Sequence, residues 1–130
     1  MNINLTPDDL RKTDAVEPGW FPAEIQKYSE EVTKGKDDKP SDGSMNAIYE
    51  FKVLDGPPQN KGRVIKKYFN EKSMFFGKNL WITFGLIDAK AGGSLTPEKL
   101  RSLQGQKLEV YVKQNGQYPN IEDYRPLQKK

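Results

Sequence analysis

The stretch KLEVYVKQNGQYPNIEDY, residues 107–124, carries the strongest fold signal in this chain. In its first half, Leu108, Val110 and Val112 alternate with polar or aromatic residues, which is typical of a strand with one buried face. The Asn-Gly pair that follows is the favoured pair for a two-residue hairpin turn. Residues 118–124 then return as a second strand. The stretch therefore predicts a β-hairpin that buries one face.

Helices are predicted upstream of this hairpin. Large apolar side chains recur at helical spacing over 74–87, and Ser73 can cap the start of this segment. We expect its Phe and Trp residues, including Trp81, to pack in the core. Thr96-Pro97-Glu98 has the N-cap, proline and acidic residue that open a second, shorter helix. A similar Thr-Pro-Asp-Asp signal at residues 6–9 predicts a short helix near the N-terminus.

Three more strands are predicted before the helical segment. Residues 45–54 form the clearest of them, because large apolar residues alternate there with polar ones. Residues 20–28 and 63–69 are the strands on either side of it in the sequence. In the first of these we expect Tyr28 to face outward. Pro57-Pro58 favours a turn between the second strand and the third.

The order of these elements predicts a mainly β fold. Three strands, a helix and then a hairpin is the order of a five-stranded OB-fold-like barrel with a helical insert between strands 3 and 4. An open α+β sheet of the same elements is the alternative, because strand order cannot be read from pattern alone. We expect a flexible N-terminal arm over 1–17, a single OB-fold domain over 18–127 and a short basic tail over 128–130.

Composition excludes several function classes. The chain of 130 residues has a net charge of +3 and contains neither Cys nor His, which excludes thiolate or His metal sites and His-based catalysis. It contains neither of the glycine-rich nucleotide-binding motifs GxxxxGK[ST] and GxGxxG. We therefore expect no enzyme, no catalytic residue, no metal and no cofactor. Without a membrane-length apolar run or a signal-peptide pattern, the chain is expected in the cytoplasm, or in the host cytoplasm if it is viral.

The segment NKGRVIKKYFN, residues 60–70, is rich in cations and rings and has no acidic residue. Strict alternation along a strand would place Arg63 and Lys67 on one face, with Lys66 and Tyr68 on the other. Which of these faces points outward stays open at this point. A solvated edge strand, on which lysines discourage aggregation, is the simpler interpretation of the same residues.

Other predicted strands place cations beside outward rings, which favours single-stranded nucleic acid as a ligand. Rings can stack on splayed bases while cations neutralise phosphates. No predicted helix has the polar face that reading a duplex groove requires. The predicted nucleic-acid-binding residues are Lys27, Tyr28, Lys52, Lys61, Arg63, Lys66, Lys67, Tyr68, Tyr111, Lys113 and Tyr118.

The chain resembles the OB-fold single-stranded DNA-binding proteins encoded by tailed bacteriophages, through the ordered blocks GWFPAEI, IYEFKVLDGP, NKGRVIKKYFN and YPNIEDYRPL. These blocks fall between residues 19 and 127. The resemblance implies a compact barrel that coats single-stranded DNA with little sequence preference during phage DNA replication and recombination. The binding residues that stand in the matching blocks are Lys52, Arg63, Lys66, Lys67 and Tyr68.

One departure from this pattern concerns partners. Many single-strand-binding proteins end in an acidic tail that recruits other proteins, whereas this chain ends in PLQKK. The expected partner is single-stranded DNA, and replication or recombination proteins are further candidates. One small barrel covers few nucleotides, so a homo-oligomer or a cooperative array fits as well. The alternatives are an OB-fold protein-interaction module that uses the same face, and a metal-dependent nuclease built on carboxylates.

Overall fold

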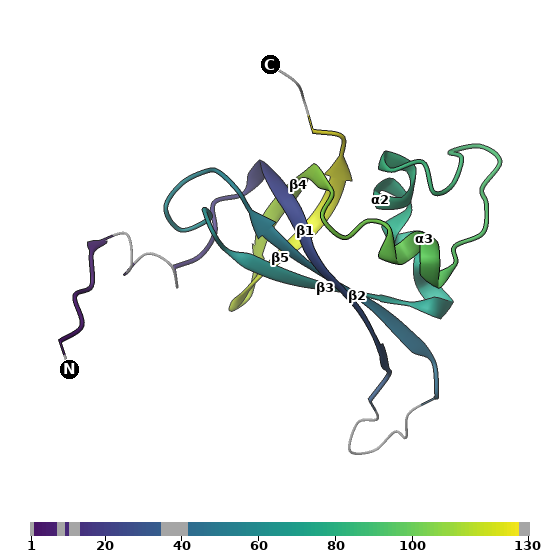
Figure 1. The fold of residues 1–130 in the computed structure, drawn as a ribbon. Coiled ribbons are helices and arrows are strands. Elements are labelled where there is room, and N and C mark those ends of the chain that lie inside the picture. Colours follow the sequence, from purple (N-terminus) through teal and green to yellow (C-terminus); the bar gives the residue numbers. More distant parts are fainter. Residues whose placement is uncertain (1, 8–9, 11–13, 35–41, 128–130) are drawn as a thin grey trace.

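The structure is a computed structural model that describes residues 2–7, 10, 14–34 and 42–127. Its strands are β1 (Gly19–Val32), β2 (Met45–Val53), β3 (Val64–Asn70), β4 (Lys107–Asn115) and β5 (Tyr118–Arg125). Its helical elements are the 3-10 helix η1 (Glu71–Gly77) and the α-helices α2 (Lys78–Thr83) and α3 (Pro97–Arg101). The helices lie together at one end of the molecule, away from the N-terminal segment (Figure 1).

The strands form one antiparallel sheet in the order β3-β2-β1-β4-β5 (Figure 1). The long strand β1 pairs with β4 through Gly19–Glu24 and with β2 through Ala23–Val32. The predicted mainly β fold with a helical insert between strands 3 and 4 is therefore confirmed. The sheet is not closed into a barrel, because no hydrogen-bond ladder joins β3 to β5 within the described part of the chain.

A β-bulge in β1 changes which side chains face the core. The pairing of β1 with β2 shifts between Ile25 and Lys27, so one extra residue lies opposite β2. A bulge of this kind reverses the alternation of all residues that follow it. Tyr28 is consequently buried beside Tyr49, at a ring distance of 5.1 Å, and the predicted outward position of Tyr28 is wrong.

The helical insert is shorter and less regular than the sequence predicts. It begins as a 3-10 turn in which the Asn70 side chain, not Ser73, accepts the capping hydrogen bond from the Lys72 backbone N–H. The α-helix ends at Thr83, just before Gly85, whose φ of +71° belongs to the left-handed region that favours glycine. The prediction for the second helix is confirmed, because the Thr96 side chain accepts from the Lys99 N–H at the start of α3.

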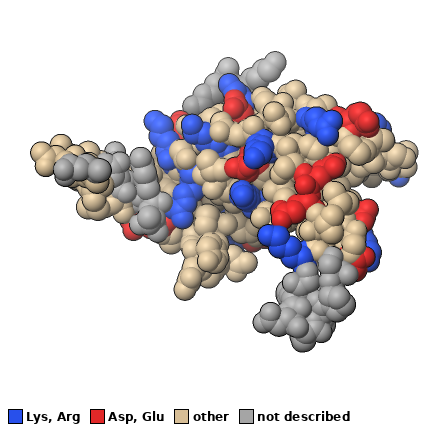
Figure 2. Space-filling view, turned by 60° about the horizontal axis from the view of Figure 1, so that its bottom comes forward, with Lys and Arg blue, Asp and Glu red and all other residues tan. Residues whose placement is uncertain are grey.

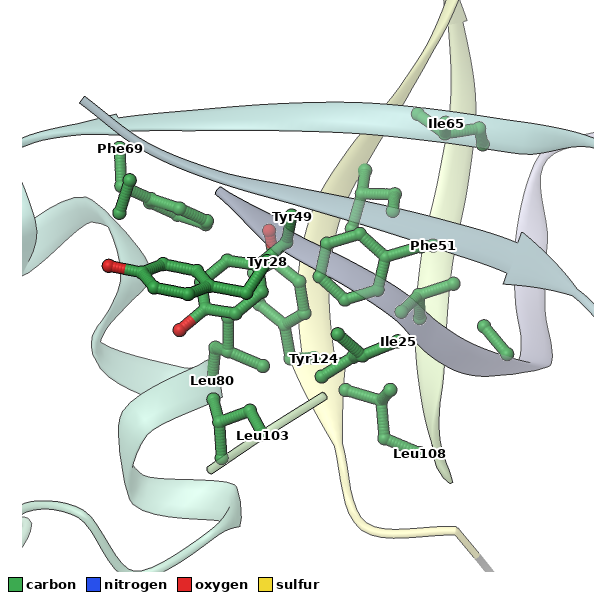
Figure 3. Packing of buried hydrophobic residues seen from close by; sticks show 14 of the residues in the cluster. Ile25, Tyr28, Tyr49, Phe51, Ile65, Phe69, Leu80, Leu103, Leu108 and Tyr124 are labelled. Atoms are coloured by element: carbon green, nitrogen blue, oxygen red, sulfur yellow. The ribbon is translucent and has the colours of Figure 1, made fainter. Parts of the chain in front are cut away.

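Aromatic rings from the strands and the insert fill the core. Tyr49 lies at its centre, with Phe51, Phe69 and Trp81 each at a ring distance of 6.1 Å. Figure 3 shows these strand residues facing the same interior space between the sheet and the helical insert. The Tyr49 hydroxyl donates to the backbone oxygen of Leu100 at 2.7 Å, which links the sheet to α3. Buried ring contacts of this kind add to the stabilisation that comes from apolar burial.

The residues just before β1 are fixed to the sheet. Val16 is buried in the core, and its N–H donates to Oε1 of Gln114 at 3.1 Å. Glu17 and the buried Asn60 exchange two hydrogen bonds, with lengths of 2.8 and 3.0 Å. The end of the predicted arm therefore packs on the domain. Asp8 and Asp9 of the predicted N-terminal helix lie outside the described residues, as do residues 35–41 between β1 and β2.

None of the described helices has both the length and the apolar character needed to cross a membrane.

Candidate nucleic-acid interface

The register of β3 decides which side chains of the basic segment face outward. Ile65 and Phe69 are buried in the core, and Lys67 lies on the same face of the strand. Lys66 and Tyr68 therefore occupy the outward face, where they pair with Glu50 and Ile48 of β2. Of the two arrangements that the sequence left open, the structure has the one that exposes Lys66 and Tyr68.

A groove runs between β3 and the start of β5. It has a volume of about 400 Å³ and is lined by Val64, Ile65, Lys66, Tyr68, Tyr118 and Pro119. Tyr68 is 55% exposed and Tyr118 is 74% exposed. Two strands that are far apart in the sequence thus bring two predicted rings and one predicted cation to the same groove. Two exposed rings in one groove can contact the same ligand, so this groove is the candidate binding surface.

A second hollow continues the first beyond Val64. It has a volume of about 290 Å³, and Lys61 and Arg63 contribute to its lining. The Arg63 guanidinium donates to the backbone oxygen of Asp14 at 3.0 Å, which holds it against the segment before β1. Lys61 is exposed at the turn that precedes β3. The cations of the turn therefore extend the charged end of the groove.

Cations from β1 and β2 lie on the same outward face. Lys27 and Lys66 both pair with Glu50, one from each side, so two cations flank this carboxylate across three strands. Lys52 pairs with Glu24 on one side and Val64 on the other. Figure 2 shows basic and acidic side chains interspersed over this view, with many of the acidic ones toward its centre and right. On β1, β2 and β3 the outward face therefore carries cations and acids in equal number, because Glu24, Glu31 and Glu50 share it with the three lysines.

Lys67 bridges the gap between the edge strands. Its ammonium donates to Oδ1 of Asn120 on β5 at 2.9 Å. Burial lowers the pKa of the Lys67 ammonium, and the nearby Glu122 carboxylate acts in the opposite direction. Asn120 in turn donates to Glu122 at 3.3 Å. Lys67 thus has its hydrogen-bonding partner within the fold and lies at the base of the gap between the two strands.

The remaining predicted site residues lie elsewhere. Tyr28 is buried, and its hydroxyl donates to Glu30 at 2.6 Å, so its ring is not available for stacking. Tyr111 is half-buried on β4 and packs edge-on against Trp20 at 5.6 Å, next to Arg125, whose guanidinium covers Trp20 at 4.2 Å. The structure gives Tyr111 a packing role that the sequence did not indicate.

Lys113 does not line the groove. It is exposed near the end of β4 and pairs with Asn120. Of the predicted residues, the structure gathers the following at or beside the groove: Lys52, Lys61, Arg63, Lys66, Lys67, Tyr68 and Tyr118. Lys27 lies further away on β1, with β2 between it and β3.

Sequence reasoning placed the rings of the helical segment in the core, and this is correct only in part. Trp81 is buried, as predicted, and its Nε1–H donates to the Met74 oxygen at 2.8 Å. Phe75 and Phe76 are instead exposed, because the chain forms a 3-10 turn where the helical periodicity predicted an α-helix. A 3-10 turn has three residues per turn, so it presents different positions to the core. Nothing in the local sequence pattern marked this change.

Within the described residues, no group of three or more Asp or Glu side chains is placed to hold a metal ion.

No protein-family model matches the chain, and no curated protein matches it.

Proposed function

We propose that this protein binds single-stranded DNA with little sequence preference, along the groove between β3 and β5 and the outward face of β2 and β3. The observation that carries the proposal is the pair of exposed rings, Tyr68 and Tyr118, that open on the same groove as Lys66. Every base has a flat face, so ring stacking tolerates any sequence, and lysines contact the phosphates that all sequences share. The protein is proposed to be a binding protein rather than an enzyme.

The fold proposed for this function is a partly open OB-fold. Its support is the strand order, the insert after the third strand and the sharing of β1 between the two halves of the sheet. The approach of β3 to β5 across the Lys67–Asn120 hydrogen bond also supports it. Grooves on the outer side of such a fold are long enough for several nucleotides.

The biological setting is proposed from the sequence resemblance alone. A sequence-tolerant coating protein would protect single strands during phage DNA replication and recombination, in the cytoplasm of the host cell. Replication or recombination proteins are the proposed protein partners. A cooperative array along the strand would allow one small domain to cover a long single-stranded region.

A titration at two salt concentrations tests the proposed function. Binding of a labelled oligo-dT is measured by fluorescence anisotropy at low and at moderate salt. If four lysines contact phosphates, the logarithm of affinity should fall with the logarithm of salt with a slope of about −3, because bound counterions are released. A duplex of the same length serves as the control and should bind more weakly. Absence of binding at low salt, or affinity that does not change with salt, would overturn the proposal.

A further inference from the structure

A pair of adjacent phenylalanines in η1 is unusually exposed. Phe75 is 65% exposed and Phe76 is 75% exposed, and their ring centroids lie 4.5 Å apart. Both rings line a groove of about 500 Å³, together with Lys78, Asn79, Glu122, Asp123 and Tyr124. Large apolar rings gathered on a surface mark a contact site for another molecule.

The rings stand on a firmly packed support. Gly77, the next residue, lies so close to the core that a Cβ atom there would be 2.8 Å from the rings of Phe69 and Trp81. The hydrogen bond from Trp81 to the Met74 oxygen fixes the residue that precedes the ring pair. Beyond it, the Asn79 side chain donates to Asp123 on β5 at 2.7 Å. Because both flanks are fixed, a ligand that contacts the rings has less conformational entropy to remove.

The ring pair is continuous with the groove of the proposed function. Tyr118 begins β5 and lines the first groove, while Glu122 and Asp123 lie further along the same strand and line the second. The part of β5 from Tyr118 to Asp123 spans about 17 Å in an extended strand. A ligand that follows β5 therefore passes from one pair of rings to the other. One OB-type domain covers ~4–16 nucleotides, which is enough to reach both.

The second groove holds one cation, Lys78, and two carboxylates that accept hydrogen bonds from within the fold. The Asp123 carboxylate accepts hydrogen bonds from Asn79 and from the Tyr124 N–H, at 2.7 and 2.8 Å. Glu122 accepts from Asn120 and lies near the Lys67 ammonium. Both carboxylates are thus engaged by donors or cations of the fold, while Lys78 is exposed on the groove.

We infer that Phe75 and Phe76 form a second base-stacking platform, and that a single strand bound at Tyr68 and Tyr118 continues along β5 to this pair, with Lys78 at a phosphate. This inference rests on the proposed function. It adds a ligand-binding role for η1 and a direction for the strand across the domain.

The test compares a short and a long oligo-dT, of about 4 and about 16 nucleotides. The variant Phe75→Ala/Phe76→Ala should bind the long oligonucleotide about tenfold more weakly than the unchanged protein. Its binding of the short oligonucleotide should be unchanged, because this length can be held at the tyrosine groove alone. The salt slope should also be unchanged, because the rings release no counterions.

Two further variants control for the loss of apolar surface. Ile3→Ala/Leu5→Ala removes two similarly exposed apolar side chains from the N-terminal segment and should leave both affinities unchanged. Phe75→Leu/Phe76→Leu keeps apolar bulk without a ring, so it should lose affinity for the long oligonucleotide as the alanine variant does. Thermal unfolding of all variants shows whether each remains folded.

The outcomes separate the inference from the proposed function. If the unchanged protein binds neither oligonucleotide, the proposed function fails. If it binds both and the alanine variant binds them equally well, the inference is wrong while the proposed function stands. Full binding by the leucine variant would also overturn the inference. The inference would also be wrong if, without DNA, the alanine variant sedimented differently from the unchanged protein. The rings would then form a contact between protein chains.

Discussion

The Lys67 ammonium and Oδ1 of Asn120 lie 2.9 Å apart and join two edge strands that no backbone ladder joins in the described part of the chain. The contact connects the two strands that line the proposed groove through side chains. A side-chain contact can lengthen or break without loss of any strand pairing. The buried rings of Phe69 and Tyr124, with centroids 6.3 Å apart, add an apolar contact between the same two strands.

The pH dependence of stability should report the environment of Lys67. Its folded-state pKa lies below the ordinary value of 10.5, because burial disfavours the charged form. Between the folded pKa and 10.5 the unfolded chain binds more protons than the folded protein does. The contribution of Lys67 to the free energy of unfolding therefore increases with pH across that window. Urea unfolding of the protein and of Lys67→Met, from neutral to alkaline pH, isolates the effect. The difference in unfolding free energy, protein minus variant, should increase with pH. A decrease would mean that the pKa of Lys67 is raised.

Charge reversal at Lys52 and Lys66 should weaken DNA binding. The variant Lys52→Glu/Lys66→Glu removes two phosphate contacts, so the salt slope should become shallower by about 1.4. Affinity should fall about equally for all sequences, because phosphates carry no base identity. Lys90→Glu/Lys99→Glu makes the same change in net charge at exposed positions of the segment that contains α3, and serves as the matched control. Equal losses in both variants would point to a general charge effect.

Removal of the two groove tyrosines should reduce affinity without reducing stability. Tyr68 and Tyr118 are exposed, so Tyr68→Ala/Tyr118→Ala should leave thermal unfolding nearly unchanged. Base stacking contributes about 1–3 kcal/mol per base, so oligo-dT binding should weaken about tenfold or more. Tyr68→Phe/Tyr118→Phe retains the rings and should retain most of the affinity. Loss of binding in the phenylalanine variant would show that the hydroxyls, not the rings, contact the ligand.

The variant Tyr124→Phe should be more stable than the parent protein. The Tyr124 hydroxyl is buried and has no hydrogen-bond partner among the residues described, so it was removed from water without compensation. Its deletion should raise the free energy of unfolding by about 1 kcal/mol. Urea unfolding at neutral pH measures this change. A loss of stability would indicate that the hydroxyl has a buried water as its partner.

Substitution of Gly77 should destabilise the insert. The backbone here does not need a left-handed conformation, but the Cβ of Gly77→Ala would lie 2.8 Å from the rings of Phe69 and Trp81. Forcing an extra carbon into a packed core costs about 1–3 kcal/mol. Ser94→Ala, at an exposed position of the loop before α3, is a control with little expected effect. An unchanged unfolding free energy for Gly77→Ala would mean that the two rings can move apart.

The sequence predicted the strands well because their patterns have a period of two. The alternation in 107–113 and around Tyr49 was sufficient to locate the buried faces of β4 and β2. The error at Tyr28 came from the bulge, since one inserted residue reverses the pattern and leaves no mark in local composition. Whether the sheet closes into a barrel was not predictable either. It depends on how β1 curves and on contacts between edge strands that are distant in sequence.

The candidate site was predictable only as a set of residue types. The NKGRVIKKYFN segment supplied cations and a ring, but its outward face depended on the pairing of β3 with β2. Tyr118 was predicted from its position at the base of the hairpin, and its approach to Tyr68 required the three-dimensional path of β5. The exposure of Phe75 and Phe76 could not be foreseen, because a change from an α-helix to a 3-10 turn is decided by the surrounding packing.

The unjoined edges of β3 and β5 also affect how the protein behaves at high concentration. A strand edge that lacks a partner can pair with the edge of another chain, which leads to aggregation. Lys66 and Lys67 place charge on one of these edges, and Pro119 removes a backbone donor from the strand opposite. The same lysines that are proposed to attract phosphates therefore keep identical chains apart. Loss of these lysines would therefore be expected to lower the solubility of the protein at high concentration.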